Sequence, residues 1–592
     1  MKNKVLIIGI DALDPRIVDE LIKKLPNLKS LESYTKLETT IPPETPVAWS
    51  AASTGSNPGK YGIFDFINRN PRTYLPKLNL AIEKPGLTKT KYVCAMKGTP
   101  FWRILNENGI QTTIIRWPVT FPPEKVNGRM LSGLGVVDIK GMLNSYSFYT
   151  NADYDENTEG KEKVVRVDIK NNLIETYISG PFIRKGGEMK DIRIPMKITI
   201  EDGKIIININ EKKYALKPSQ WSNMIRVKFK IGFLTEICGI LKFYLLSIKP
   251  RFRLYMTSIQ IDPEDQAVNI TYPEEYGKEL VKNIGLFHTL GMPEDTKAVT
   301  EDKLNESIFF EQIKQIEEER KKMFFYELKR FKEGVYAFVF DAGDRLKHIF
   351  WKNKVLHVKS KFIISKKIED YYVEKDKFIG DVISKLDDNT KLIIFSDHGF
   401  SSFERQVNIN TWLVDEGFMK DKGTGGNLFE FVDWKNTQVY SLGFTSVYLN
   451  LKGRESNGIV DEEEKNELIN EIINKLKGLK DKNRNVFTNV YNGREIYKGE
   501  YSYLAPDIVI GFSPGYRASW KNAVGGLDNK IIFDNRSKWR GDHLIDRSHV
   551  PGVLFTNFKI NKKNPSIMDI TPTVLKFFNI KIPENMDGKP LN

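Results

Sequence analysis

The chain has few cysteines and no long uncharged apolar segment. Only two of its 592 residues are cysteines, Cys94 and Cys238, and two thiols cannot form the disulfide framework of a secreted domain. We therefore expect free thiols in a reducing cytoplasm. The most apolar stretch, residues 231–248, contains Glu236 and Lys242, and no run reaches the roughly 20 apolar residues of a membrane span. We expect a β-hairpin there, with a membrane-facing patch as the alternative.

The sequence also lacks the motifs of a nucleic-acid-binding protein. Its net charge of +14 arises from 90 basic and 76 acidic residues, but the two signs are interspersed, without a zinc finger, RNP-like motif or basic arm. A composition rich in lysine, glutamate and isoleucine is typical of thermophile proteins. The positive surface could still attract anionic phosphoesters. Lys2 and Lys4 are followed at once by an apolar strand, so we expect no signal peptide and a cytoplasmic location.

Three short apolar runs each end near an acid. VLIIGI, YAFVF and KLIIFS are continuous apolar segments, the pattern of strands buried on both faces, and Asp11, Asp344 and Asp397 follow them. In an open parallel sheet, functional groups gather beyond the carboxyl ends of the strands. The sequence therefore predicts an α/β core with a central, mostly parallel sheet flanked by helices, and a cluster of acids at one edge of that sheet.

Histidines accompany two of these acids. Asp344 and His348 have i, i+4 spacing, so on a helix they share one face and can reach one ion. Asp397 and His398 are neighbours in a predicted loop, where they can point to opposite sides and serve two ions. Carboxylate and imidazole ligands suit zinc, with manganese or iron as alternatives. Two ions about 4 Å apart would stabilise the entering and leaving oxygens of an in-line displacement at phosphorus.

Thr45 stands before a segment of small residues, PVAWSAAS, that is expected to form a helix with Pro46 in its first turn. Helix N-terminal amides would favour an anionic phosphoryl group beside Thr45, and metal coordination can activate a threonine hydroxyl. We therefore interpret Thr45 as a nucleophile. The alternative is a helix N-cap, a common position for threonine.

Six motifs occur in a fixed order along the chain: IGIDALD, TPVAWSAASTGSNPGKYGIFDF, DAGDRLKH, SDHGF, GDH and DITPTVL…MDG. Together they resemble the alkaline phosphatase superfamily, specifically its type I phosphodiesterase/nucleotide pyrophosphatase branch. The resemblance covers most of the chain except roughly residues 150–255. It implies an alkaline phosphatase-like core and hydrolysis of a phosphate ester at two divalent metals through a phospho-threonine intermediate. The C-x-P-x-R motif of the sulfatase branch is missing from TPVAW.

The resemblance also implies a ligand set. One metal would be held by Asp11, Thr45, Asp397 and His398, and the other by Asp344, His348 and His543. His549 is the alternative to His543, which would then contact the substrate or a ligand. His288 and His357 match no ligand motif, so we expect packing or surface roles for them.

Three blocks emerge along the chain. Residues 1–150 and 256–592 alternate strands and helices and are expected to form the metal-binding core, whereas residues 151–255 show period-two strands with predicted turns at NN, EDGK and NEKK. This middle block is predicted to be a β-rich insertion that caps the site. Candidate substrate contacts, chosen because arginine can grip phosphate and tryptophan can stack on a ring, are Lys60, Arg345, Arg517, Trp520 and Arg540. For Arg345, an exposed salt bridge is the alternative.

Several functions fit this pattern. The predicted activity is a phosphodiesterase or nucleotide pyrophosphatase, with a phosphomonoesterase, a phosphonate hydrolase or a phosphotransferase as alternatives on the same core. The substrate would be a small-molecule, sugar-linked or lipid-linked phosphoester, and the sequence specifies no oligomeric state. A non-catalytic glycan- or lipid-binding protein with the same fold is the alternative outside enzymes. The presence of all seven candidate ligands argues against it.

Overall fold

The chain forms two compact units. The computed structural model describes residues 3–84, 91–153, 163–185, 188–231, 235–356, 363–424 and 426–592. The first unit comprises Met1–Val119, Val126–Gly128 and Phe331–Asn592, and the second comprises Thr120–Lys125 and Arg129–Arg330. The second unit thus extends beyond the predicted insertion at both ends, and the domain boundaries at residues 150 and 255 stay a prediction.

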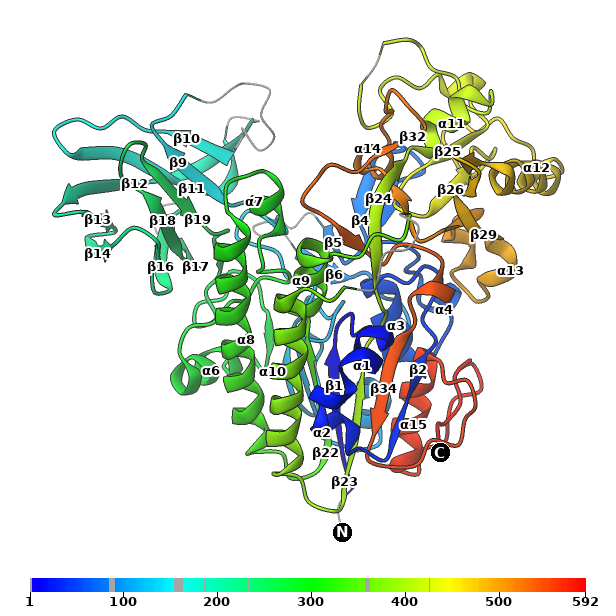
Figure 1. Cartoon of the computed structure of the whole chain (residues 1–592), viewed down its shortest axis with the longest axis horizontal. Coiled ribbons are helices and arrows are strands. Elements are labelled where there is room, and N and C mark those ends of the chain that lie inside the picture. The colour runs from blue at the N-terminus through cyan, green and yellow to red at the C-terminus, as the bar shows by residue number, and fades with distance from the viewer. Residues whose placement is uncertain are drawn as a thin grey trace. The chain divides into compact units, whose positions relative to one another are not determined.

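Six strands of the first unit form a mostly parallel sheet. Their order is β2 (Ser33–Leu37), β34 (Gly552–Thr556), β23 (Thr390–Phe395), β1 (Lys4–Ile10), β22 (Gly334–Phe340) and β7 (Thr112–Ile115). β1 pairs in parallel with β22 and β23, and β7 in parallel with β22, whereas β34 runs antiparallel to both of its neighbours. Figure 1 shows β1, β23 and β34 side by side. The predicted α/β core is confirmed.

These strands form where the apolar runs predict them because both faces of the sheet are covered. Every residue of β22 is buried, and so is every residue of β1 after Lys4. Helices α3 (Thr45–Thr54), α5 (Phe101–Glu107) and α15 (Ile570–Phe577) pack on one another, as do α2 (Pro26–Lys29), α9 (Ala342–Phe350) and α10 (Lys366–Ile383). Gly9 lets α3 approach β1, because a Cβ at this position would lie 2.2 Å from the Trp49 ring.

The first unit also contains a second group of small sheets around its own apolar core. One consists of β31 (Gly515–Ala518), β24 (Ser401–Val407) and β32 (Ile532–Asp534), with β33 (Gly541–Asp542) paired to β24. The other has the order β25 (Val439–Ser441), β26 (Ser446–Leu449), β30 (Ile508–Phe512) and β29 (Phe487–Asn492). Helices α11 (Ile409–Asp415) and α12 (Lys465–Gly478) supply further apolar side chains to this core.

The second unit is rich in antiparallel strands, as predicted. One sheet has the order β11 (Leu173–Lys185), β12 (Glu188–Glu201), β13 (Lys204–Ile209) and β14 (Lys212–Leu216), and its turns fall at the predicted EDGK and NEKK segments. A five-stranded sheet contains β10 (Val164–Arg166), β9 (Ser147–Thr150), β19 (Arg253–Met256), β18 (Phe243–Ser247) and β15 (Gln220–Trp221). Helices α6 (Tyr276–Ile284), α7 (Thr296–Thr300) and α8 (Glu306–Leu328) follow in the chain.

The apolar segment 231–248 forms strands, but the predicted hairpin is wrong. β17 (Glu236–Leu241) pairs with β16 (Ile225–Lys230) and β20 (Gln260–Ile261), whereas β18 pairs with β15 and β19. Only Lys242 separates β17 from β18, which is too short for the usual two-residue hairpin turn. The chain therefore passes from one sheet to another. Over the described residues, no helix has the length and apolarity to cross a membrane. Cys94 and Cys238 are not joined in a disulfide, as expected.

Candidate metal centre

The parallel strands bring the three predicted acids to one edge of the sheet. Asp11 directly follows β1, Asp397 comes two residues after the end of β23, and Asp344 lies in the first turn of α9 after β22. Because β1 stands between β22 and β23 in parallel register, the carboxyl ends of these strands coincide. All three acids are buried.

Asp11, Asp397 and His398 form the first group of candidate ligands, with ligand atoms within 4.8 Å of one another. His398 Nε2 lies 3.2 Å from Asp397 Oδ2 and 3.8 Å from Asp11 Oδ1. The side chains of Asp397 and His398 therefore meet, whereas the sequence suggested that they could diverge toward two ions.

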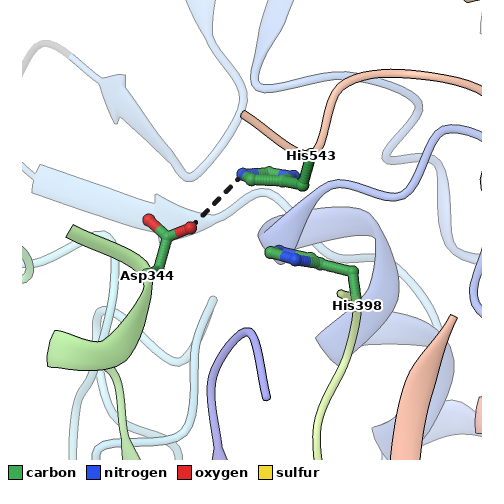
Figure 2. Close-up of side chains that lie close together, drawn as sticks. All are labelled: Asp344, His398 and His543. Carbon is green, nitrogen blue, oxygen red and sulfur yellow. Dashed lines mark ion pairs between the residues drawn. The ribbon is translucent and has the colours of Figure 1, made fainter. Parts of the chain in front are cut away.

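Asp344, His398 and His543 form the second group. Figure 2 shows their side chains converging, with His543 Nε2 3.5 Å from Asp344 Oδ1. His398 belongs to both groups, and its ring stacks on that of His543 at 3.7 Å. His348 lies one helical turn after Asp344, as predicted, and its Nε2 is 3.2 Å from Asp344 Oδ2.

Several carboxylate oxygens at this site have no hydrogen-bond donor. Among the described residues, both oxygens of Asp11, Oδ1 of Asp344 and Oδ2 of Asp397 are buried without a partner. Burying such oxygens unpaired is costly, and native proteins pair or ligate nearly all of them. A bound cation would satisfy them, so these acids fit a metal centre.

Each of the three histidines holds its Nδ1 against a backbone carbonyl. The distances are 2.8 Å from His348 to Gly541 O, 3.0 Å from His398 to Gly399 O and 2.7 Å from His543 to Pro43 O. A carbonyl only accepts, so Nδ1 carries the proton and the Nε2 lone pair faces the acids. Burial lowers the pKa of His398 and of His543, which favours the neutral imidazole that binds a metal.

The acids differ in charge state because their surroundings differ. Burial, followed by the charges of Asp397 and Asp344, raises the pKa of Asp11 well above its usual value. Burial likewise raises the pKa of Asp397 to about 7. For Asp344, burial acts in the same direction, but its interactions with His348, His543 and Arg345 outweigh burial and lower the pKa. Without a cation, the neighbouring acids Asp11, Asp344 and Asp397 repel one another at this edge of the sheet.

Thr45 is the first residue of α3, and Glu44 occupies the N-cap position. The interpretation of Thr45 as the N-cap is therefore wrong, because its backbone is already helical. Its hydroxyl lies 3.4 Å from Nε2 of His398, the histidine that both groups share. Pro46 stands in the first turn, as expected.

The remaining histidines lie elsewhere. His549 Nε2 is 2.9 Å from the Thr488 hydroxyl and joins neither group of candidate ligands. His288, in the second unit, is buried with its Nδ1 2.8 Å from Glu319 Oε2. His357 lies outside the described residues.

The candidate substrate contacts Arg345 and Lys60 are both engaged in ion pairs. Arg345 is buried and lies 3.1 Å from Asp341 and 3.5 Å from Asp344. The exposed salt bridge considered for it is therefore wrong, because α9 turns this face inward. Lys60 Nζ is 2.6 Å from Asp587 Oδ1, and it also donates to a backbone carbonyl.

Arg517, Trp520 and Arg540 lie near one another in the chain but differ in exposure. Arg517 is buried, with its guanidinium 2.7 Å from Asp542 and 4.1 Å from the Trp520 ring centroid. Trp520 is 43% exposed, so its ring is accessible. Arg540 is exposed and donates to the carbonyl of Ile349.

Sequence reasoning missed two residues beside the site. Trp539 stacks on the His348 ring at 3.7 Å, and Asp542 accepts a hydrogen bond from the Trp539 indole. Asp542 belongs to the GDH motif that identified His543 as a candidate ligand, so the sequence did mark the position of Asp542. Nothing in the local sequence marks Trp539, because its contact with α9 is formed only by the fold.

The sheet and its buried donors define an α/β protein with a candidate metal centre. A family model, type I phosphodiesterase/nucleotide pyrophosphatase, matches residues 5–185 and 267–537. These segments make up most of the chain, and the protein belongs to this family. The match includes six of the seven candidate ligands and ends before His543. No curated protein matches the chain.

Proposed function

We propose that this protein is a metal-dependent hydrolase of phosphate esters, specifically a phosphodiesterase or nucleotide pyrophosphatase that acts through a phospho-threonine. The observation that carries the proposal is the position of Thr45. Its hydroxyl is 3.4 Å from His398, where two groups of buried acids and histidines meet. A hydroxyl at a helix start beside these donors is suited to attack phosphorus.

Two ions would be held by the donors present. In the proposal, Asp11, Thr45, Asp397 and His398 hold one, and Asp344, His348 and His543 hold the other. Zinc is the expected metal, with Mn²⁺ and Fe²⁺ as alternatives, because the donors are neutral imidazoles and carboxylates. When bound, such ions neutralise charge on the phosphoryl oxygens and on the entering and leaving oxygens.

The chain's own residues then account for two displacements. Thr45 Oγ1 attacks phosphorus in line while the bond from phosphorus to the leaving oxygen breaks, and the leaving oxygen takes up the proton that the threonine hydroxyl gives up. Water next attacks the phospho-threonine, the bond from Thr45 to phosphorus breaks, and the threonine regains its proton. Two inversions give net retention of configuration at phosphorus. The first turn of α3 holds Thr45 in place throughout.

The test measures metal content and hydrolysis together. The purified chain is assayed with a chromogenic phosphodiester and a phosphomonoester, with and without chelator. We expect about two transition-metal ions per chain and chelator-sensitive cleavage of the diester. A preference for the monoester would favour a phosphomonoesterase, and hydrolysis of a carbon–phosphorus substrate a phosphonate hydrolase.

Other outcomes would redirect the proposal. Bound metal with turnover only after addition of an alcohol acceptor would indicate a phosphotransferase, and bound metal without any turnover a glycan- or lipid-binding protein. Failure to bind metal would refute the proposed site. His543→Ala and His549→Ala form a matched pair of variants, and only the first should lose metal. A cytoplasmic location, in keeping with two cysteines that form no disulfide, completes the proposal.

A further inference from the structure

The segment 539–543 contributes one candidate ligand, His543, and holds another, His348, in place. The Trp539 indole stacks on the imidazole of His348, with ring centroids 3.7 Å apart and an interplanar angle of 28°. Phe400 contacts the same imidazole edge-on at 4.9 Å. Such ring contacts restrict rotation of the imidazole about its χ2 bond, and that rotation decides where Nε2 points.

Asp542 connects this indole to the second histidine. The Trp539 Nε1–H donates to Asp542 Oδ2 at 2.8 Å, and Arg517 donates to the same oxygen at 2.7 Å. The other oxygen accepts the backbone N–H of His543 at 2.9 Å. Asp542 and Arg517 are each only 1% exposed, so their charge-assisted hydrogen bond is shielded from water and well ordered.

The backbone between them completes the arrangement. Gly541 O accepts the Nδ1–H of His348 at 2.8 Å. A Cβ on Gly541 would lie 2.7 Å from Trp351 Cβ and 2.9 Å from the carbonyl of Lys347, so no side chain fits there. Gly541 thus sets the tautomer of His348, and Trp539 sets its ring plane.

We propose that Trp539 is a positioning residue for His348, and that Asp542 and Arg517 hold the indole in its stacked orientation. This inference rests on the proposed two-metal site. The Trp539 indole contacts the side chains of His348, Asp542 and Trp520. The Trp539 backbone bonds to Asn535 and Ser537, and none of these contacts leads to Asp11 or Asp397. Trp539 should therefore support the ion of Asp344, His348 and His543 and leave the other ion unaffected.

The test compares two tryptophans with similar stacking. Trp539→Ala removes the ring beside His348. The matched control, Trp434→Ala, removes a half-buried indole that stacks on Tyr74 at 3.5 Å. Zn²⁺ or Co²⁺ is titrated into the full chain against a chelator of known affinity. In Trp539→Ala we expect one of two ions to bind about 10- to 100-fold more weakly, the range for residues that orient metal ligands, with an altered Co²⁺ absorption spectrum.

Further variants keep the inference falsifiable. Trp539→Phe retains a stacking ring and should keep more of the affinity than Trp539→Ala, so an equal loss in both would overturn the role of stacking. Trp539→Leu fills part of the space without an aromatic ring and replaces Trp539→Ala if that variant does not fold. Wild-type affinity for both ions in the leucine or alanine variant would refute the inference. A wild-type chain that binds no metal would instead refute the proposed function.

Discussion

Buried acids occur in both compact units, but their surroundings differ. Asp295, in the second unit, receives hydrogen bonds from the Tyr255 hydroxyl at 2.5 Å, the Asn144 amide at 2.7 Å and the Ala298 N–H at 2.8 Å. Asp11, in the first unit, has no donor on either oxygen among the described residues. Each acid is at most 3% exposed. Burial alone therefore does not distinguish Asp295 from the candidate ligand Asp11, whereas their hydrogen bonds do.

Glu301 of the second unit shows the same contrast with Asp11. Glu301 accepts from the Tyr146 hydroxyl and from Lys163 Nζ, so its charge has a partner inside the protein. In the first unit, the unpaired oxygens of Asp344 and Asp397 accompany those of Asp11. A fold retains such a cluster against its electrostatic cost only if something else is gained. A bound cation is the simplest gain.

The largest effect is expected for Thr45→Ala, which tests whether the first unit carries out phosphodiester hydrolysis. Thr45→Ala should lower phosphodiester hydrolysis at least about 1000-fold, because it removes the proposed nucleophile, while metal remains bound. Turnover and metal content are measured on the same preparation. Thr35→Ala, which removes the hydroxyl of a half-buried threonine on β2, is the control. Normal turnover in Thr45→Ala would show that Thr45 is not the nucleophile.

The next prediction compares substitutions of Asp11 and Asp295. Asp11→Asn should abolish tight binding of one ion and raise the free energy of unfolding of the metal-free chain, because a buried like charge is removed. Asp295→Asn should leave metal binding unchanged and lower that free energy by about 1–3 kcal/mol, because three donors then share one acceptor oxygen. Metal titration and denaturant unfolding in chelator measure both quantities. Similar behaviour of the two variants would break the contrast between the units.

A smaller effect concerns pH. The folded-state pKa of Asp397 is raised to about 7, against roughly 3.9 for an unfolded chain. A raised carboxyl pKa contributes stability below the unfolded value, and this contribution is lost as pH rises through 7. With chelator present, the midpoint of thermal unfolding should therefore be lower at pH 8 than at pH 5 because of Asp397. Saturating metal should remove that loss at pH 8, and Asp397→Asn should remove it without metal. Equal pH dependence of Asp397→Asn and wild type would contradict this account.

The smallest effect is expected at Lys60. Its partly exposed ion pair with Asp587 is of a kind that contributes about 0–1 kcal/mol. Lys60→Ala should therefore change the free energy of unfolding by less than about 1 kcal/mol and leave KM for the diester unchanged. A large increase in KM would instead assign Lys60 to substrate binding and enlarge the functional region of the first unit.

The sequence predicted the parts of the fold that depend on local pattern. Continuous apolar runs became β1, β22 and β23, and Pro46 began α3 as expected. The NN, EDGK and NEKK turns separate the strands of the second unit where predicted. These features depend on neighbouring residues, so they can be inferred from composition and spacing.

Contacts between distant segments could not be inferred in this way. The strands on either side of Lys242 joined different sheets, because strand pairing depends on partners elsewhere in the chain. Arg345 is buried because α9 packs with that face inward. The stacking of Trp539 on His348 joins residues 191 positions apart, and no pattern in either segment indicates it.

By itself, the sequence determined which residue types stand at the ends of the apolar strands, and therefore the donors available for a metal. Only the tertiary structure decided that His398 serves both groups and that His543, rather than His549, faces Asp344. The physical reason is that strand ends follow from local hydrophobicity, whereas the directions of side chains from five separate segments depend on how the sheet and its helices pack.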